Sequence, residues 1–341
     1  MIDNNITTTV NFMQTSKSLS DTLIFVSQNI LIYLPLIFFI FGFIGFIGNV
    51  FTYLQPQLRS NTCCIYSLCG SFIDIITLSL DSFPNYFSGK YGITLPWSTS
   101  SGLCKFSIFL WAFLPYLAIS FLYMAIIDRF AITCDHTSSI RRITQLRIVP
   151  RMIGLTILAS GLFTLDAPLN HDLVPIYGCV SVNPTLTSIV YIIFSGLLQP
   201  ITMITFVLLT YRNVRRSRGR VSDAVQTNRR NLRNQFIVTI FAQILVTTFI
   251  SIQWIIMYMY FTFTLNYPRT LVQFSIVLFV FNLSNNFYYL NNVKAFYITI
   301  LTSHVFRKTL LGGLNKLFRR YLRQQMNVSM VNPFTQTRNK N

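Results

Sequence analysis

The chain has 341 residues, of which 52% are hydrophobic and 11% are charged. A soluble domain of this length would carry about 25% charged residues, so the composition excludes an ordinary soluble protein and indicates a membrane protein. The 27 lysines and arginines outnumber the 9 acids and give a net charge of +18, a value that nucleic-acid-binding proteins also show.

Seven apolar runs follow one another along the chain, each near the ~20 residues that a helix needs to cross ~30 Å of hydrocarbon. They cover residues 29–54, 62–83, 104–130, 148–168, 186–211, 234–263 and 270–300. The strands of a membrane barrel would be shorter and polar on one face, so the runs favour helices. The sequence therefore predicts an all-α membrane protein, a seven-transmembrane helix bundle.

The runs divide the chain into four parts. Residues 1–28 have no apolar core, so we expect an extracellular segment without a cleavable signal peptide, with the first span as signal anchor. Residues 29–303 form the transmembrane domain. Residues 304–323 place apolar side chains at helical spacing among basic ones, which predicts an amphipathic helix bound to lipids of the inner leaflet and weakened or divided by Gly312-Gly313. Residues 324–341 are polar, and we expect them to be a disordered cytoplasmic tail.

Basic residues predict the orientation of the bundle, because cationic loops mark the cytoplasmic side. With the amino end outside, only Lys17, Lys90, Lys105 and Arg269 lie outside, and the other 27 − 4 = 23 lie at or near the cytoplasmic side. The split predicts a multi-pass protein of the plasma membrane with an extracellular amino end and a cytoplasmic carboxyl end. It also explains the +18 charge without a nucleic-acid partner.

Three residues on the predicted outer side are candidates for covalent modification. Asn5 begins the glycosylation sequon Asn5-Ile6-Thr7. Cys104 opens the third run and Cys179 lies in the loop before the fifth, so both face an oxidising compartment. We expect a disulfide between them that holds this loop over the bundle as a lid; two unpaired thiols are the alternative.

An acid and an arginine, Asp128 and Arg129, end the third run and are followed by Phe130. Arg129 lies 25 residues after Cys104, which is ~37 Å along a helix with a rise of 1.5 Å per residue. If Cys104 marks the outer end of this helix, the two charges lie at its cytoplasmic end.

In their order and spacing, these features resemble the rhodopsin-like (class A) G-protein-coupled receptors. The matches are seven spans, a cysteine that opens the third, a second in the next outer loop, and Asp-Arg-aromatic 24 to 26 residues after the first; Gly48-Asn49, Asp74, Trp97 and Pro200 match as well. The resemblance covers about residues 29 to 323. The sequence departs from the family at Phe130, where tyrosine is usual, in span six, which lacks Cys-Trp-x-Pro, and at residues 295–299, where Asn-Pro-x-x-Tyr is missing.

The resemblance implies a receptor that binds an extracellular ligand and activates a heterotrimeric G protein. In this reading Asp128 restrains Arg129 at rest, and the freed Arg129 helps to form the G-protein pocket; an interfacial anchor is the alternative. Asp74, an acid within a span, would bind a sodium ion or change protonation. Asn49, Asn291 and Asn292 are its expected neighbours, and no other cofactor is expected.

For the ligand, the sequence predicts an aromatic and mildly acidic cavity. Its expected residues are Asp81, Trp97, Trp111, Tyr116 and Asp166. Trp111 stands where amine receptors of the family carry an aspartate, so a biogenic amine is not expected. A short peptide with a basic or amidated end, as in invertebrate neuropeptide receptors, is preferred over a small molecule.

Two other functions stay open, and catalysis finds no support. The chain has no glutamate, three dispersed histidines and no metal or nucleophile motif. A membrane transporter or channel would use Asp74 and Asp81 along an ion path. A receptor-like scaffold without signalling would account for the motifs missing from spans six and seven.

Overall fold

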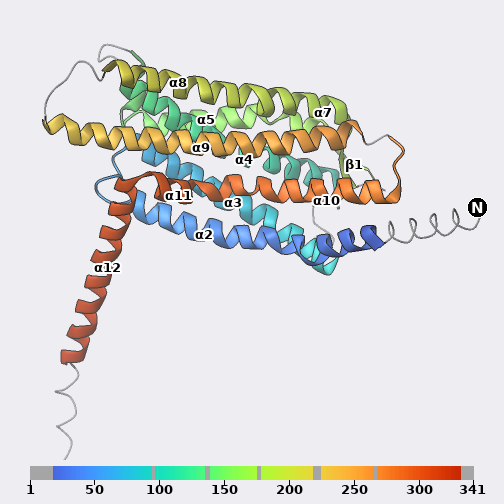
Figure 1. Ribbon diagram of the computed structural model, residues 1–341, viewed down its shortest axis with the longest axis horizontal. Helices are drawn as coiled ribbons and strands as arrows, with labels where there is room; N and C mark the ends of the chain where they lie inside the picture. The colour runs from blue at the N-terminus through green and yellow to red at the C-terminus, as the bar shows by residue number, and fades with distance from the viewer. Residues whose placement is uncertain are drawn as a thin grey trace, which may run out of the picture.

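The computed structural model describes residues 18–93, 97, 99–134, 139–174, 178–217, 224–264 and 267–331. In these residues, seven helices are long and apolar enough to cross a membrane, and they run alongside one another as a bundle (Figure 1). The predicted all-α seven-helix architecture is confirmed, and the chain is a multi-pass membrane protein. The elements in chain order are the 3-10 helix η1 (Leu31–Tyr33), α2 (Leu34–Tyr53), α3 (Thr62–Tyr91), α4 (Ser101–Thr133), the 3-10 helix η3 (Ser139–Thr144), α5 (Val149–Phe163), α6 (Asp166–Leu169), β1 (His171–Val174), β2 (Gly178–Ser181), α7 (Pro184–Tyr191), the π-helix η4 (Ile192–Leu198), α8 (Gln199–Ser217), α9 (Ala224–Phe263), α10 (Leu271–Tyr288), α11 (Leu290–Thr302) and α12 (His304–Val331).

Several helices are longer than the runs that predicted them. The first spanning helix begins at Ser18 rather than at residue 29, so part of the predicted amino-terminal segment is helical. α3 continues to Tyr91, beyond the predicted end at residue 83, and α9 begins at Ala224 rather than at residue 234. Hydropathy marks only the part of a helix that lies in hydrocarbon, whereas its backbone hydrogen bonds continue into water once the helix has formed.

The fifth span contains the main irregularity of the bundle. α7, η4 and α8 follow without a gap, and the π-helical turn ends just before Pro200, the second residue of α8. Proline has no N–H and its ring clashes with the carbonyl four residues earlier, which widens the preceding turn. At this point the Tyr123 hydroxyl of α4 donates a hydrogen bond to the Gln199 carbonyl oxygen at 2.5 Å.

The seventh run forms two helices, α10 and α11, with Tyr289 at the junction. The N–H of Tyr289 bonds to the carbonyl of Asn286 at 3.1 Å, and the N–H of Asn292 bonds to the carbonyl of Tyr289 at 3.0 Å. These are bonds over three residues, so the turn is tighter than in an α-helix. Tyr289 is buried there, and its hydroxyl accepts a hydrogen bond from the Asn85 side chain of α3 at 3.1 Å.

α12 leaves the bundle at a steep angle (Figure 1) and is longer than predicted. It runs from His304 to Val331 without a break at Gly312-Gly313, so the prediction that the glycines divide it is wrong. A Cβ at Gly313 would lie 2.8 Å from the Phe51 ring of α2. The glycine therefore lets α12 approach α2 closely. Residues 332–341, the rest of the predicted tail, lie outside the described residues.

Buried side chains hold the helices together in two main clusters. One joins α3, α4, α8 and α9 and includes Tyr66, Phe121 and Ile244. The other joins α2, α11 and the first turn of α12 around Phe296 and Phe306. The outward faces of the spans expose large apolar side chains, such as Ile40, Ile44 and Ile47 of α2, which is the surface that a lipid environment requires.

Candidate functional site

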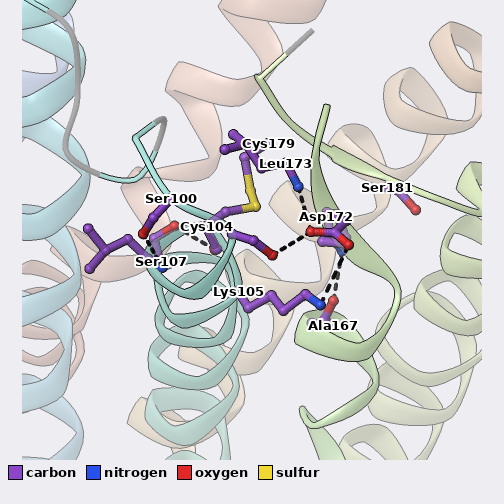
Figure 2. Close-up of a disulfide and its surroundings, with 12 residues drawn as sticks. Ser100, Cys104, Lys105, Ser107, Ala167, Asp172, Leu173, Cys179 and Ser181 are labelled. Atoms are coloured by element: carbon purple, nitrogen blue, oxygen red, sulfur yellow. Dashed lines mark hydrogen bonds and ion pairs between the residues drawn. A yellow bond between two sulfur atoms is a disulfide. The ribbon is translucent and has the colours of Figure 1, made fainter. Parts of the chain in front are cut away.

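At one end of the bundle, a disulfide ties a β-hairpin to the helix α4. Cys104, in the first turn of α4, is bonded to Cys179 of β2 (Figure 2). The strands β1 and β2 pair antiparallel, with Leu173 opposite Cys179. The predicted disulfide is confirmed, and the strand-like segment that it holds forms the second half of a hairpin. We call this end the disulfide end.

A second contact between α4 and the hairpin is not apparent from the sequence. Asp172 of β1 accepts hydrogen bonds from the Ser101 hydroxyl at 2.5 Å and the Leu173 N–H at 2.8 Å, and Lys105 lies 3.7 Å away. Figure 2 shows Asp172 and Lys105 pointing toward each other beside the disulfide. The Ser101 hydroxyl, followed by the Leu173 N–H and the Lys105 ammonium, lowers the pKa of Asp172 from its ordinary value.

A cavity of about 680 Å³ lies among the helices in the half of the bundle next to this end. The volume falls within the range of pockets for small molecules and short peptides. Four of the five residues predicted for a ligand cavity line it together: Asp81 of α3, Trp111 and Tyr116 of α4, and Asp166 of α6. The described part of the wall contains two carboxylates and no lysine, arginine or histidine.

Trp97, the fifth predicted cavity residue, lies outside the described wall. Its ring packs edge-on against that of Trp111, with 5.0 Å between the ring centroids, so it contacts a residue of the wall. The sequence analysis expected it on the wall as one of the aromatic residues of an aromatic and mildly acidic cavity. Distance along the chain does not say which face of the preceding loop a side chain takes.

Aromatic residues from the fifth, sixth and seventh spans complete the wall. The Trp254 ring of α9 lies 5.2 Å from the ring of Tyr191 and 5.2 Å from that of Tyr288. The Trp254 indole N–H donates to Asn285 Oδ1 of α10 at 3.2 Å, and all four residues line the cavity. Trp254 could have been singled out from the sequence, because it is the only tryptophan of its span. Tyr191 and Tyr288 could not, because the chain has 17 tyrosines and nothing in the sequence distinguishes these two.

A second, smaller cavity of about 60 Å³ lies next to the first, since Pro115, Ile119 and Tyr288 line both. The structure brings together here the four residues predicted as an internal polar site: Asn49, Asp74, Asn291 and Asn292. Asn49 of α2 donates from Nδ2 to Ser71 Oγ of α3 at 2.5 Å. The helices α2, α3 and α11 thus meet around a shared polar cavity.

Lys294 also lines this smaller cavity, and sequence reasoning did not single it out. It counted only as one of 23 basic residues that set the orientation. Its signal was the same as that of Asp74: one charge within an apolar run is costly and marks a functional position. Its ammonium donates hydrogen bonds to the carbonyl oxygen and the side-chain oxygen of Asn291, at 2.7 and 2.8 Å.

At the opposite end of α4, Asp128 and Arg129 are buried rather than exposed to water. Asp128 is 0% exposed and Arg129 is 6% exposed, and an Arg129 guanidinium nitrogen lies 3.8 Å from an Asp128 carboxylate oxygen. Arg129 also donates a hydrogen bond to the Asn61 side-chain oxygen, and the Thr62 hydroxyl donates one to Asp128 Oδ1. Asn61 caps the amino end of α3, where its side chain accepts from the Cys63 N–H. We call this end the arginine end.

Two predicted residues remain to be placed. Phe130 is half-buried, and its ring packs against Phe206 of α8 at 5.7 Å between centroids. Asn5, the predicted glycosylation site, lies outside the described residues. In the described part of the chain, no group of three or more His, Cys, Asp or Glu side chains could hold a metal ion.

No protein-family model matches the chain, and no curated protein matches it either. What these sites can do therefore has to be inferred from their own residues and geometry.

Proposed function

We propose that the protein is a G-protein-coupled receptor of the rhodopsin-like type. The observation that carries the proposal is the course of α4. This one helix bears Trp111 and Tyr116 on the wall of the large cavity and, close to its other end, the buried pair Asp128 and Arg129. A ligand in the cavity and a partner at the arginine end would therefore contact the same helix, which gives the two sites a direct physical connection.

The arginine end suits a switch better than an interfacial anchor. An anchor would expose its charges to headgroups and water, whereas Asp128 and Arg129 are buried and bonded to Thr62 of α3 and to Asn61, which caps that helix. The contacts thus connect two helices, and separating α3 from α4 would break them. Outward helix motion would then free Arg129 for the partner, a heterotrimeric G protein.

The cavity favours a ligand with a positively charged group. Two carboxylates, Asp81 and Asp166, line the cavity beside aromatic rings that attract cations, and the wall formed by the described residues contains no basic side chain. A short peptide with a basic end combines such a group with apolar side chains for Trp111, Tyr116 and Trp254. We therefore keep the short peptide, rather than a small molecule, as the proposed ligand.

The orientation follows from the charge split of 23 to 4. We place the disulfide end outside the plasma membrane, where a disulfide is stable, and the arginine end in the cytoplasm. Asn5 would then be available for glycosylation. α12 exposes Leu314, Leu317 and Phe318 among basic residues and leaves the bundle steeply, which suits a helix lying on the inner leaflet.

The test is a screen of short peptides on cells that express the full chain, with nucleotide exchange on a promiscuous G protein as the readout. We expect basic or amidated peptides to activate, and Asp81→Asn and Asp166→Asn to lower their potency at equal surface expression. Asp21→Asn, at an exposed position near the amino end, is the matched control and should leave potency unchanged. Activation that ignores both cavity substitutions would contradict the assignment of the cavity.

A transporter or channel is the second candidate, because the two cavities share Pro115, Ile119 and Tyr288 and so bring Asp81 and Asp74 onto one path. It predicts ion or substrate flux through proteoliposomes of the purified chain, without any G protein. Peptide binding with neither flux nor nucleotide exchange would instead favour a receptor-like scaffold.

A further inference from the structure

The smaller cavity holds one acid and one base that come from different helices. Asp74 belongs to α3 and Lys294 to α11, and both line the same space of about 60 Å³. A single charge buried within the bundle is energetically costly. Opposite charges that share a cavity of low dielectric constant attract each other, which lowers this cost for both. No other side chain on the described walls of either cavity is basic.

The hydrogen bonds of Lys294 leave room for Asp74. An ammonium has three protons, and two of the acceptors around Lys294 are the backbone and side-chain oxygens of Asn291. Among the described residues, the ion pairs within 4.0 Å are Lys105–Asp172 and Arg129–Asp128. Lys294 and Asp74 are not one of these pairs, so a gap remains between the Lys294 ammonium and the Asp74 carboxylate.

Buried polar atoms around the cavity point to water in that gap. Asn49 Oδ1, Tyr66 Oη and Asn291 Nδ2 are buried without a partner, and all three residues line the cavity. Buried polar groups are normally hydrogen-bonded, and a polar cavity of this volume accommodates a few water molecules. Water would join these atoms to the charged pair.

We propose that Lys294 is the built-in counterion of Asp74, bridged to it by water, and that this pair excludes a sodium ion from the cavity. Asp74 and Lys294 together are neutral. A sodium ion would bring the cavity to a net positive charge, and its only anionic ligand would be the carboxylate already facing the ammonium. The residues present therefore do not fit the sodium site that the resemblance implies.

The test is the thermal unfolding midpoint of the purified full chain in sodium chloride and in choline chloride at equal ionic strength. The wild type should show the same midpoint in both salts. Lys294→Met leaves Asp74 without its counterion, so its midpoint should be lower in choline and rise, saturably, with sodium. Lys308→Met, at an exposed position of α12, is the matched control and should show no sodium dependence.

The double variant Asp74→Asn/Lys294→Met separates a charge pair from two independent losses. In choline, the unfolding midpoint of the double variant should lie above that of Lys294→Met and close to that of the wild type, and sodium should not shift it. If Lys294→Met gives no folded protein, Lys294→Gln replaces it with the same expectations. A sodium-dependent shift in the wild type that Asp74→Asn abolishes would overturn the proposal, as would losses that add in the double variant. The assay contains no G protein or peptide, so its outcome is independent of the proposed receptor function.

Discussion

The contact between Thr62 and Asp128 gives the sharpest test of the arginine end. Thr62→Val keeps the shape of the side chain but removes the hydroxyl that donates to Asp128 Oδ1. Asp128 is 0% exposed, so water does not replace the lost donor. A hydrogen bond to a charged group contributes ~1.5–3 kcal/mol, which corresponds to a change of about 10- to 150-fold in an equilibrium constant. If the contact holds the resting bundle, the substitution should shift the equilibrium toward the released state by a factor of this order.

Under the proposed receptor function, the assay is basal nucleotide exchange per molecule of the protein at the cell surface, measured beside the thermal unfolding midpoint. Thr62→Val should raise basal exchange and lower the midpoint. The matched control is Thr77→Val in the same helix, because the Thr77 hydroxyl is equally buried but donates only to the Ile73 carbonyl one turn earlier. Arg129→Ala should abolish exchange while peptide binding is retained. Unchanged basal exchange in Thr62→Val, or an equal rise in Thr77→Val, would refute the role of the Thr62–Asp128 contact in holding the resting bundle.

Three further outcomes are expected. Gly48→Ala places a Cβ against the buried Phe296 ring of α11, closer than van der Waals contact allows, and should cost ~1–3 kcal/mol in unfolding. At Gly154 an added Cβ meets nothing within 4 Å, so Gly154→Ala should be neutral or stabilising by up to about 1 kcal/mol, and equal midpoints for the two variants would contradict this. Cys104→Ala and Cys179→Ala should each lower the free energy of unfolding by ~2–5 kcal/mol and make the midpoint insensitive to reductant, unlike that of the wild type. Because the pKa of Asp172 is lowered in the fold, its contribution is present above the ordinary carboxylate pKa and is lost as pH falls through the lowered value. Asp172→Asn should therefore melt below the wild type at pH 7 and together with it in acid, and coincident curves at pH 7 would count against the contact.

The seven spans could be read from the sequence because the requirement for a transmembrane helix is local. About 20 apolar residues in succession satisfy it, whatever the rest of the chain does. The disulfide was predictable for a related reason, since the charge bias of the loops placed Cys104 and Cys179 on one side of the membrane. Four of the predicted cavity residues line one cavity as expected, namely Asp81, Trp111, Tyr116 and Asp166, whereas Trp97 contacts the ring of Trp111 and does not line the described wall.

The irregular segments required the tertiary structure. The sequence around Tyr289 contains no proline or glycine that would predict a helix junction. In the structure the junction lies where the Asn85 side chain of α3 donates a hydrogen bond to the Tyr289 hydroxyl. The continuity of α12 through Gly313 is a second case. Local propensity predicts a weak point there, but the glycine is where α12 contacts Phe51 of α2, and a larger side chain would not fit.

By itself, the sequence determined the fold class, the positions of the spans, and which acids and cysteines stand out within them, because composition and spacing act along the chain. Only the tertiary structure decided the partners. It placed Lys294 beside Asp74 and set Thr62 and Asn61 against Asp128 and Arg129. The physical reason is that the energy of a buried charge depends on the groups that face it from other helices, and how the helices are rotated and packed decides which groups those are.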